Sequence, residues 1–178
     1  KTSYDIVDSI DLITSLNNPK TNLTAAIISL LVCSFFGTIL ELNGYSYLLM
    51  LIILLLLIPG TVVHELIHYL FQWYYSHKKP HLGFKFPFPY SALNTESSYS
   101  RNQAIFTALA PFIIITLLLI IPAIFVGFLP RIILFAWASI EGLTCYVDFY
   151  FVFRLLKYPS YISVKNINLK NTIIKYTQ

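Results

Sequence analysis

Four long apolar stretches constrain the fold of this chain more than any other feature of its sequence. These stretches run approximately over residues 23–42, 45–75, 103–128 and 131–158. Each reaches or exceeds the roughly 20 residues that an α-helix needs to cross a hydrocarbon core of about 30 Å. Only 11% of the residues are charged and 57% are hydrophobic, whereas soluble domains carry about 25% charged residues. The sequence therefore predicts an all-α membrane protein, with residues 1–178 forming a single domain built as a four-span transmembrane helical bundle.

The segments outside these stretches are short. Residues 1–20 carry apolar side chains at helical spacing, and the aspartates lie on another face of the same helix. This pattern predicts an interfacial helix on the membrane surface. The apolar residues are Ile6, Val7, Ile10, Ile13 and Leu16. An exposed helix packed on the bundle is the alternative. Residues 76–102 would form a loop between the second and third spans, and residues 159–178 a C-terminal tail.

Basic residues predict the orientation of the bundle. With four spans, both ends of the chain and the 76–102 loop share one side of the membrane, and the other side carries Arg131 alone. Cytoplasmic segments are the ones enriched in Lys and Arg. We therefore expect a multi-pass protein of the plasma membrane with both termini in the cytoplasm. The formal net charge of +4 does not indicate a nucleic-acid partner, because most basic residues flank the apolar stretches.

The 76–102 loop contains a period-two pattern that is typical of a β-strand. Its apolar members are Leu82, Phe84, Phe86, Phe88 and Tyr90, and they alternate with Gly83, Lys85, Pro87 and Pro89. The prolines remove main-chain donors from one edge, so we expect an edge strand. Its other edge, at Phe84, Phe86 and Phe88, could receive an extended peptide. The alternative is pairing with the strand-like tail in a small sheet at the cytoplasmic face.

The second apolar stretch contains the pentapeptide His64-Glu65-Leu66-Ile67-His68. On an α-helix the two histidines lie on one face, about 6 Å apart along the axis, so that both imidazoles can bind one metal ion. Glu65 is then placed to act as a general base. Ionisable groups in an apolar helix are costly without partners or a function. Pro59-Gly60 predicts a kink just before the motif, which would open a polar cavity there.

A third ligand is expected from the fourth apolar stretch. Asp148 lies a few helical turns before the basic residues Arg154 and Lys157, and the two histidines lie a few turns before Lys78. If these basic residues mark the membrane surface, all three side chains lie at similar depth. Glu141, about two turns deeper on the same helix face, is the alternative ligand. It could instead orient a ligand histidine through the second ring N–H. Two imidazoles and one carboxylate leave the fourth position of a tetrahedral zinc site open.

Four further residues complete the set of candidates. Tyr99 and Arg101, just ahead of the third stretch, could contact the oxyanion or the substrate, or could be interfacial anchors. Cys33 and Cys145 lie within apolar stretches and are interpreted as small buried hydrophobic residues.

Three segments of the chain resemble a family of small prokaryotic membrane proteins described as putative zincin peptidases. They are Val63-His64-Glu65-Leu66-Ile67-His68, Leu109-Ala110-Pro111-Phe112, and Asp148 followed by Leu155-Leu156-Lys157-Tyr158-Pro159. More distantly, the chain is similar to the site-two protease group, although its Asp-Gly pair is replaced here by Asp148-Phe149. The resemblance implies zinc held by His64, His68 and Asp148, with Glu65 as base.

The sequence thus predicts a zinc-dependent endopeptidase that works within or beside the membrane. Its substrate would be a membrane protein or peptide, cut near the cytoplasmic side, and the lipid bilayer would be a further partner. Two other classes stay open at this point. One is a membrane protein that binds metal or handles ions without hydrolysis, since polar helices with His, Glu and Asp also line ion pathways. The other is an inactive membrane scaffold.

Overall fold

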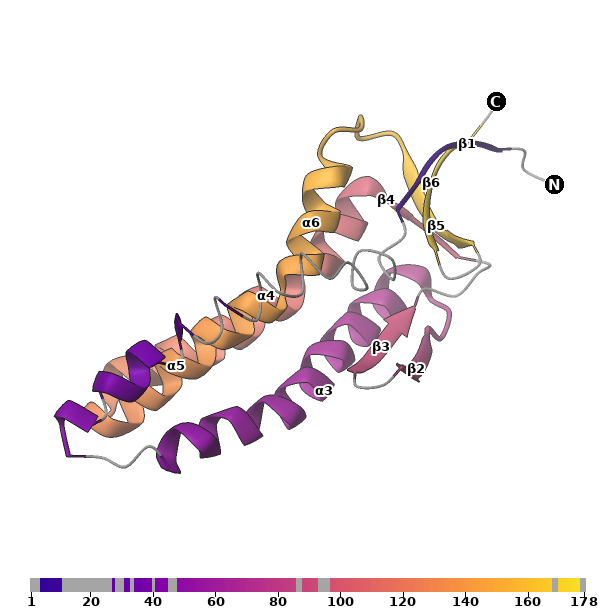
Figure 1. Ribbon diagram of the computed structural model, residues 1–178. Coiled ribbons are helices and arrows are strands. Elements are labelled where there is room, and N and C mark those ends of the chain that lie inside the picture. The colour runs from indigo at the N-terminus through magenta and orange to yellow at the C-terminus, as the bar shows by residue number, and fades with distance from the viewer. Residues whose placement is uncertain are drawn as a thin grey trace.

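The computed structural model describes residues 4–10, 27, 31–32, 34–39, 41–44, 48–85, 88–92, 97–167 and 170–176. The described residues form both helices and strands (Figure 1). In chain order they are β1 (Tyr4–Ile10), α3 (Leu48–Ser76), β2 (His81–Lys85), β3 (Phe88–Ala92), β4 (Ser98–Ser100), α4 (Arg101–Phe125), α5 (Phe128–Thr144), α6 (Tyr146–Leu155), β5 (Ser163–Ile167) and β6 (Lys170–Tyr176).

Helix α4 is the centre of the helical part, because it contacts α3, α5 and α6. It begins with a capping box: the Ser100 hydroxyl accepts a hydrogen bond from the Gln103 main-chain N–H at 3.3 Å, and the Gln103 side chain accepts one from the Ser100 N–H at 2.9 Å. Such reciprocal bonds satisfy main-chain donors that a helix start leaves open. The start of α4 is thereby fixed directly after strand β4.

Small residues let the helices approach closely beside the histidine motif. Ala110 of α4 and Ala138 of α5 pack with Ile67 of α3 in one buried cluster. Gly60 of α3 is buried as well, and a Cβ added there would lie 3.4 Å from the Trp137 Nε1 atom of α5. A larger side chain would press against that indole. The glycine therefore allows the close contact of α3 and α5 one turn before His64.

A four-stranded antiparallel sheet in the order β1-β6-β5-β4 packs at one end of the helices, next to α6 (Figure 1). A buried core joins it to α4 and α6. The members of this core are Tyr99, Ala104, Ala108, Phe151, Val152, Leu155, Ile162, Val164 and Ile173. Strands β2 and β3 form a separate antiparallel hairpin that contacts α3 through β3. The four-stranded sheet thus packs on α4 and α6, and the hairpin packs on α3, the helix with the histidine motif.

The prediction of an all-α bundle with four spans is wrong. Among the described residues one helix, α4, is long and apolar enough to cross a membrane, and α5 with α6 would add a second only as one broken span bent by 46°. The core helix of a soluble protein can pass the same test of length and composition. The predicted span 131–158 is interrupted at Cys145, where α5 gives way to α6. The plasma-membrane topology with both termini in the cytoplasm required four spans, and it is overturned with them.

The predicted interfacial helix at residues 1–20 is also wrong where the structure describes it. Tyr4–Ile10 form β1, which pairs antiparallel with β6, with Ile6 opposite Ile174 and a bulge between Ile6 and Asp8. Apolar residues at this spacing suit a helix, yet β-branched side chains favour a strand when a partner edge is present. Residues 11–20, with the rest of the apolar pattern, lie outside the described residues.

The period-two segment folds back on itself. The pattern predicted one edge strand, but the segment forms two strands, β2 and β3, which pair with each other in an antiparallel hairpin with Gly83 opposite Tyr90. A Cβ at position 83 would lie 2.3 Å from the Tyr90 ring, so the ring occupies the space above the glycine. The alternative pairing with the C-terminal tail is wrong, because β5 and β6 pair with each other and with β4 and β1.

Strand β1 is tied to the end of α6 by one carboxylate. Asp8 Oδ2 accepts hydrogen bonds from Arg154 Nη2 at 2.7 Å and from the Tyr158 hydroxyl. The hydrogen bond from Tyr158 lowers the pKa of the Asp8 carboxyl, and it outweighs the smaller effect of burial. Since a folded-state pKa below the ordinary value means that the ionised form stabilises the fold, this contribution is present above that value and is lost as pH falls through the folded pKa.

Asp8→Asn is therefore expected to lower the free energy of unfolding at pH 7 by about 1 kcal/mol, or roughly 2–4 °C in Tm. The difference from the wild type should begin to shrink as pH falls below the ordinary pKa of 3.8, and it should disappear only below the lower folded-state pKa. Thermal unfolding at pH 7 and at pH 3 measures both effects. Asp5→Asn, an exposed position on the same strand, serves as the control. Equal losses for the two variants at pH 7 would contradict a specific role of the Asp8 contacts.

Candidate metal centre

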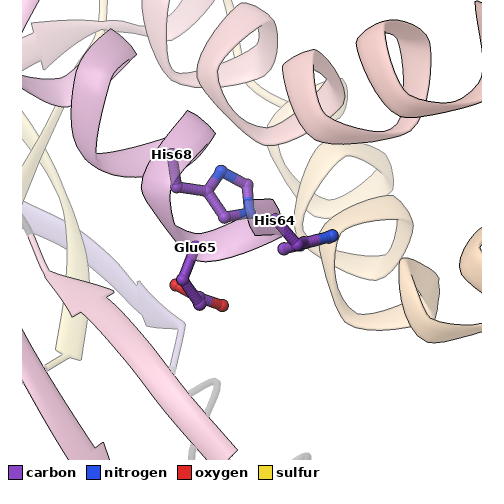
Figure 2. Close-up of side chains that lie close together, drawn as sticks. All are labelled: His64, Glu65 and His68. Atoms are coloured by element: carbon purple, nitrogen blue, oxygen red, sulfur yellow. The ribbon is translucent and has the colours of Figure 1, made fainter. Parts of the chain in front are cut away.

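The histidine motif lies in the second half of α3, where the helix passes its neighbours. His64 and His68 are buried, each with an exposed fraction of 8%. Their ring centroids are 4.8 Å apart, and the rings meet edge to face. Figure 2 shows both rings and the Glu65 carboxylate leaving the same stretch of helix. One ligand atom from each of the three residues lies within 4.8 Å of the other two, a spacing that one metal ion could bridge.

Asp148 reaches both histidines from the first turn of α6. Its Oδ2 atom lies 3.2 Å from His64 Nε2, and its Oδ1 atom lies 3.3 Å from His68 Nε2. The position in the first turn of α6 suits an ionised carboxylate, because the positive end of the helix dipole lies there. The fold therefore brings the three predicted ligands together from two separate helices.

Two acceptors on the far side of the rings orient the imidazoles. His68 Nδ1 lies 2.9 Å from the Thr107 carbonyl oxygen of α4. A carbonyl only accepts, so Nδ1 must carry a hydrogen, and Nε2 is the ring nitrogen that faces Asp148 and is available to a metal ion. His64 Nδ1 has the corresponding contact with Glu141 Oε1 at 2.9 Å, and Glu141 is 1% exposed. Both rings are thus oriented from behind, as metal-ligating histidines usually are.

The Nε2 atoms of the two histidines face the two oxygens of one carboxylate at 3.2 and 3.3 Å. Such an arrangement is favourable only with a proton or a cation between each nitrogen and the oxygen that it faces. In tetrahedral zinc sites the Zn–N and Zn–O distances of about 2.0–2.1 Å place neighbouring ligand atoms roughly 3.3–3.4 Å apart. The donor types and their separations therefore fit a zinc ion.

The charges of the site follow from the same contacts. Burial lowers the pKa of His64, but hydrogen bonds with Asp148, Cys145 and Glu141 outweigh it and raise the pKa to about 12. Burial alone would raise the pKa of the Asp148 carboxyl, yet the neighbouring histidines lower it overall. The side chains therefore favour one positive charge between them. A metal ion that binds there displaces the ring proton.

Glu65 is held on the side of α3 that faces the hairpin. Its Oε2 atom accepts a hydrogen bond of 2.7 Å from the Ser91 main-chain N–H of β3. Gln72, two turns further along α3, donates from Nε2 to the Ser91 hydroxyl at 3.2 Å. Burial raises the pKa of the Glu65 carboxyl, although both histidines oppose this effect. Strand β3 thus positions a carboxylate that stands next to the two rings.

The remaining predicted site residues lie elsewhere. Tyr99 packs in the core between the sheet and α6, and Arg101 donates to the Tyr158 carbonyl and to the Asn102 side chain. Phe84 is 68% exposed on β2, and Phe88 begins β3. Phe86 lies outside the described residues. The contacts of Tyr99 and Arg101 support the sheet and not the histidine cluster.

Several contact residues were missed from the sequence. Cys145, interpreted as a small hydrophobic residue, is fully buried with its Sγ atom 3.8 Å from His64 Nδ1. With His64 and Glu141 it forms a second set of closely spaced ligand atoms. Its spacing of four residues from Glu141 was a usable signal, as was the spacing of Gln72 from His68. Ser91 contributes a main-chain N–H, for which no side-chain pattern exists.

Comparison with known families identifies one relationship. A family model described as putative zincin peptidase matches residues 57–163. The match covers more than half of the chain and includes every residue of the cluster from His64 to Asp148. Comparisons with curated proteins and with solved structures gave no match.

Proposed function

This chain belongs to the putative zincin peptidase family, and on that premise we propose that it is a zinc-dependent endopeptidase. The observation that carries the proposal is the Asp148 carboxylate, which faces the Nε2 atoms of His64 and His68 at 3.2 and 3.3 Å. Zincins are metallopeptidases, so the family supports a peptide hydrolase and zinc as the metal. The residue roles below are our assignments.

We assign the metal to His64 Nε2, His68 Nε2 and the Asp148 carboxylate. Glu141 is the orienting partner of His64 and not a ligand, because its Oε1 atom contacts Nδ1, on the opposite side of the ring from Asp148. Three protein ligands leave one position of a tetrahedral site open, which is the arrangement of catalytic zinc sites. This assignment favours an enzyme over a closed structural site.

The chemistry is divided between the ion and Glu65. A zinc ion at this position supplies Lewis-acid chemistry, which polarises the peptide carbonyl and makes water nucleophilic at neutral pH. Glu65 takes a proton from the attacking water and returns it to the leaving amine as the C–N bond breaks. Ser91 holds Oε2, so we assign the proton transfer to Oε1. The buried surroundings strengthen these electrostatic interactions by excluding water.

The hairpin offers an edge for an extended peptide. The Ser91 N–H donates to Glu65, so it points out of the hairpin, as do the main-chain groups of its partner Leu82. Such outward-pointing pairs recur every two residues along an antiparallel ladder. The next such pair is Pro89 with Phe84. Among the described strands β2 and β3 pair only with each other. The outer edge of β2, at Phe84, therefore keeps a donor for a peptide strand. Strand β3 lies between this edge and Glu65, so we propose that the edge holds a segment of the substrate beside the one that is cleaved.

We further propose that the substrate is a membrane-embedded or membrane-adjacent peptide. Helix α4 is long and apolar enough to cross a membrane, and large apolar side chains are exposed along it. They include Phe106, Leu118 and Phe125, with exposed fractions of 61%, 65% and 82%. Co-sedimentation of the purified protein with liposomes tests this part. Protein that stays in the supernatant without detergent would contradict it.

Metal removal tests the proposed function. The purified protein should contain about one zinc ion per chain and cleave a library of quenched fluorescent peptides. A chelator should abolish both the zinc content and the cleavage, and added zinc should restore them, because the nucleophile depends on the ion. Elemental analysis and the fluorescence increase are the two measurements.

The other outcomes identify the competing classes. Bound zinc without cleavage would indicate a metal-binding protein, and metal flux through reconstituted liposomes would indicate ion handling. A protein that purifies without metal and cuts nothing would be a scaffold. Cleavage that survives complete removal of zinc would contradict the proposed chemistry outright.

A further inference from the structure

A proline in the neighbouring helix lies next to the candidate metal centre, and we propose that Pro111 is a positioning residue for His68. It acts through the main-chain carbonyl of Thr107, which it releases from α4. The inference rests on the proposed function, because it concerns how one assigned zinc ligand is oriented. It adds a residue that touches neither the metal nor the substrate.

The main-chain hydrogen bonds of α4 are interrupted at one position. This helix runs from Arg101 to Phe125 with Pro111 inside it. In an α-helix the N–H of each residue donates to the carbonyl four residues earlier, which for position 111 is the carbonyl of Thr107. Proline has no N–H, and its ring also presses against that carbonyl. Pro111 therefore denies the Thr107 carbonyl its helical donor and pushes it outward.

The missing donor is replaced from another helix. His68 of α3 donates from Nδ1 to the Thr107 carbonyl at 2.9 Å. Both residues are buried, with exposed fractions of 8% and 4%, and Pro111 is among the most deeply buried side chains. A buried carbonyl without a donor costs free energy, so this contact is strongly favoured. One bond thus satisfies α4 and fixes the imidazole of α3.

The consequence for the metal centre is a fixed tautomer. With a hydrogen held on Nδ1 by the Thr107 carbonyl, Nε2 is the ring nitrogen left to bind a metal ion beside Asp148, 3.3 Å away. A residue with an N–H at position 111 would make the helical bond itself and draw the carbonyl back into α4. His68 would then lose its orienting partner. Loss of such an outer partner typically weakens metal affinity about 10–100-fold.

The experiment compares three variants of the full chain. Pro111→Ala and Pro111→Val both restore the N–H, and valine keeps most of the side-chain volume. Pro122→Ala, in an exposed part of the same helix, is the matched control. Zinc affinity is measured by competition with a chromophoric chelator, the His68 tautomer by ¹⁵N NMR without metal, and stability by thermal unfolding.

We expect both Pro111 variants to bind zinc about tenfold or more weakly and to lose the pure Nδ1–H tautomer. Their Tm should not fall below that of the wild type, because alanine suits a helix interior far better than proline. Pro122→Ala should keep the wild-type affinity and tautomer. A proline that merely filled space would show a lower Tm together with weaker zinc binding.

Two results would overturn the inference. In the first, the Pro111 variants keep both the wild-type zinc affinity and the Nδ1–H tautomer. In the second, they lose affinity and Tm together while the tautomer stays unchanged. A wild-type protein that binds no zinc would instead refute the proposed function, and the metal-free tautomer comparison would still decide whether Pro111 orients His68.

Discussion

Replacing Glu65 with glutamine is expected to slow peptide cleavage by about 10²–10⁴-fold while the zinc content stays at one ion per chain. The loss follows from the proton that the side chain has to carry. Glutamine matches glutamate in size and keeps an oxygen that can accept the Ser91 N–H, now 2.7 Å from Oε2. It cannot take a proton from water. The variant therefore separates proton transfer from metal binding.

The position of Glu65 suits a general base. Burial raises the pKa of its carboxyl against the opposing effect of His68 and His64, which brings the group closer to the neutral range in which a base is most effective. One of its carboxylate oxygens lies within 4.8 Å of a ring nitrogen of each histidine. A water molecule attacking a carbonyl next to the rings would thus be within reach of the carboxylate.

A matched substitution at an exposed carboxylate controls for the change of charge. Glu41 is exposed, at the end of a helical segment far along the chain from the motif, and Glu41→Gln should cleave at the wild-type rate. The two variants are compared by initial rates on the same quenched peptide at equal zinc content. Wild-type turnover by Glu65→Gln would rule the carboxylate out as the base.

The histidine cluster was the most predictable part of the molecule. A spacing of four residues places two side chains on one helix face whatever surrounds the helix, so His64 and His68 had to lie together once α3 formed. Asp148 was expected from its depth relative to the basic residues, and the two helices do bring it to both rings. That comparison assumed that the second and fourth apolar stretches cross a membrane in the same direction, so the contact is present although its premise of four spans is wrong.

The sheets were less predictable because their partners are distant in sequence. Ile6, Val7 and Ile10 fit a helical face as well as a strand. They form a strand because β6, more than 160 residues later in the chain, provides the edge with which they pair. The break between α5 and α6 had no proline to announce it. Its nearest signal is Gly142, where an added Cβ would lie 3.5 Å from the Phe112 ring. Apolar composition alone favoured one continuous helix.

The main-chain groups that contact the site could not be predicted from the pattern of side chains. The Ser91 N–H and the Thr107 carbonyl each hold one residue of the motif, but neither depends on the identity of the residue that provides it. Pro111 is the exception, since a proline four residues after a carbonyl marks that carbonyl as lacking its helical donor. Pro111 belongs to the segment Leu109-Ala110-Pro111-Phe112, one of the three that carried the family resemblance. The role that we propose for it is to orient His68 through the Thr107 carbonyl.

The largest effect on metal binding is expected from Asp148→Ala, which should weaken zinc affinity by about a hundredfold or more. Zinc sites in proteins bind with about 10–16 kcal/mol, which corresponds to roughly 3 kcal/mol for each ligand. The variant would also leave the His64 and His68 rings without the carboxylate that now faces both Nε2 atoms. Zinc content after purification and a chelator competition measure the loss.

Glu141→Ala is the comparison that distinguishes a ligand from an orienting residue. Its carboxylate contacts Nδ1 of His64 and is almost completely buried, so its removal should loosen one ring and weaken zinc binding by about tenfold. The loss for Asp148→Ala should therefore exceed that for Glu141→Ala by at least about tenfold. If Asp148→Ala kept its full zinc while Glu141→Ala lost it, the ion would lie on the Nδ1 side of His64. Cys145 Sγ lies 3.8 Å from that nitrogen, so the thiol and Glu141 would then be the ligands.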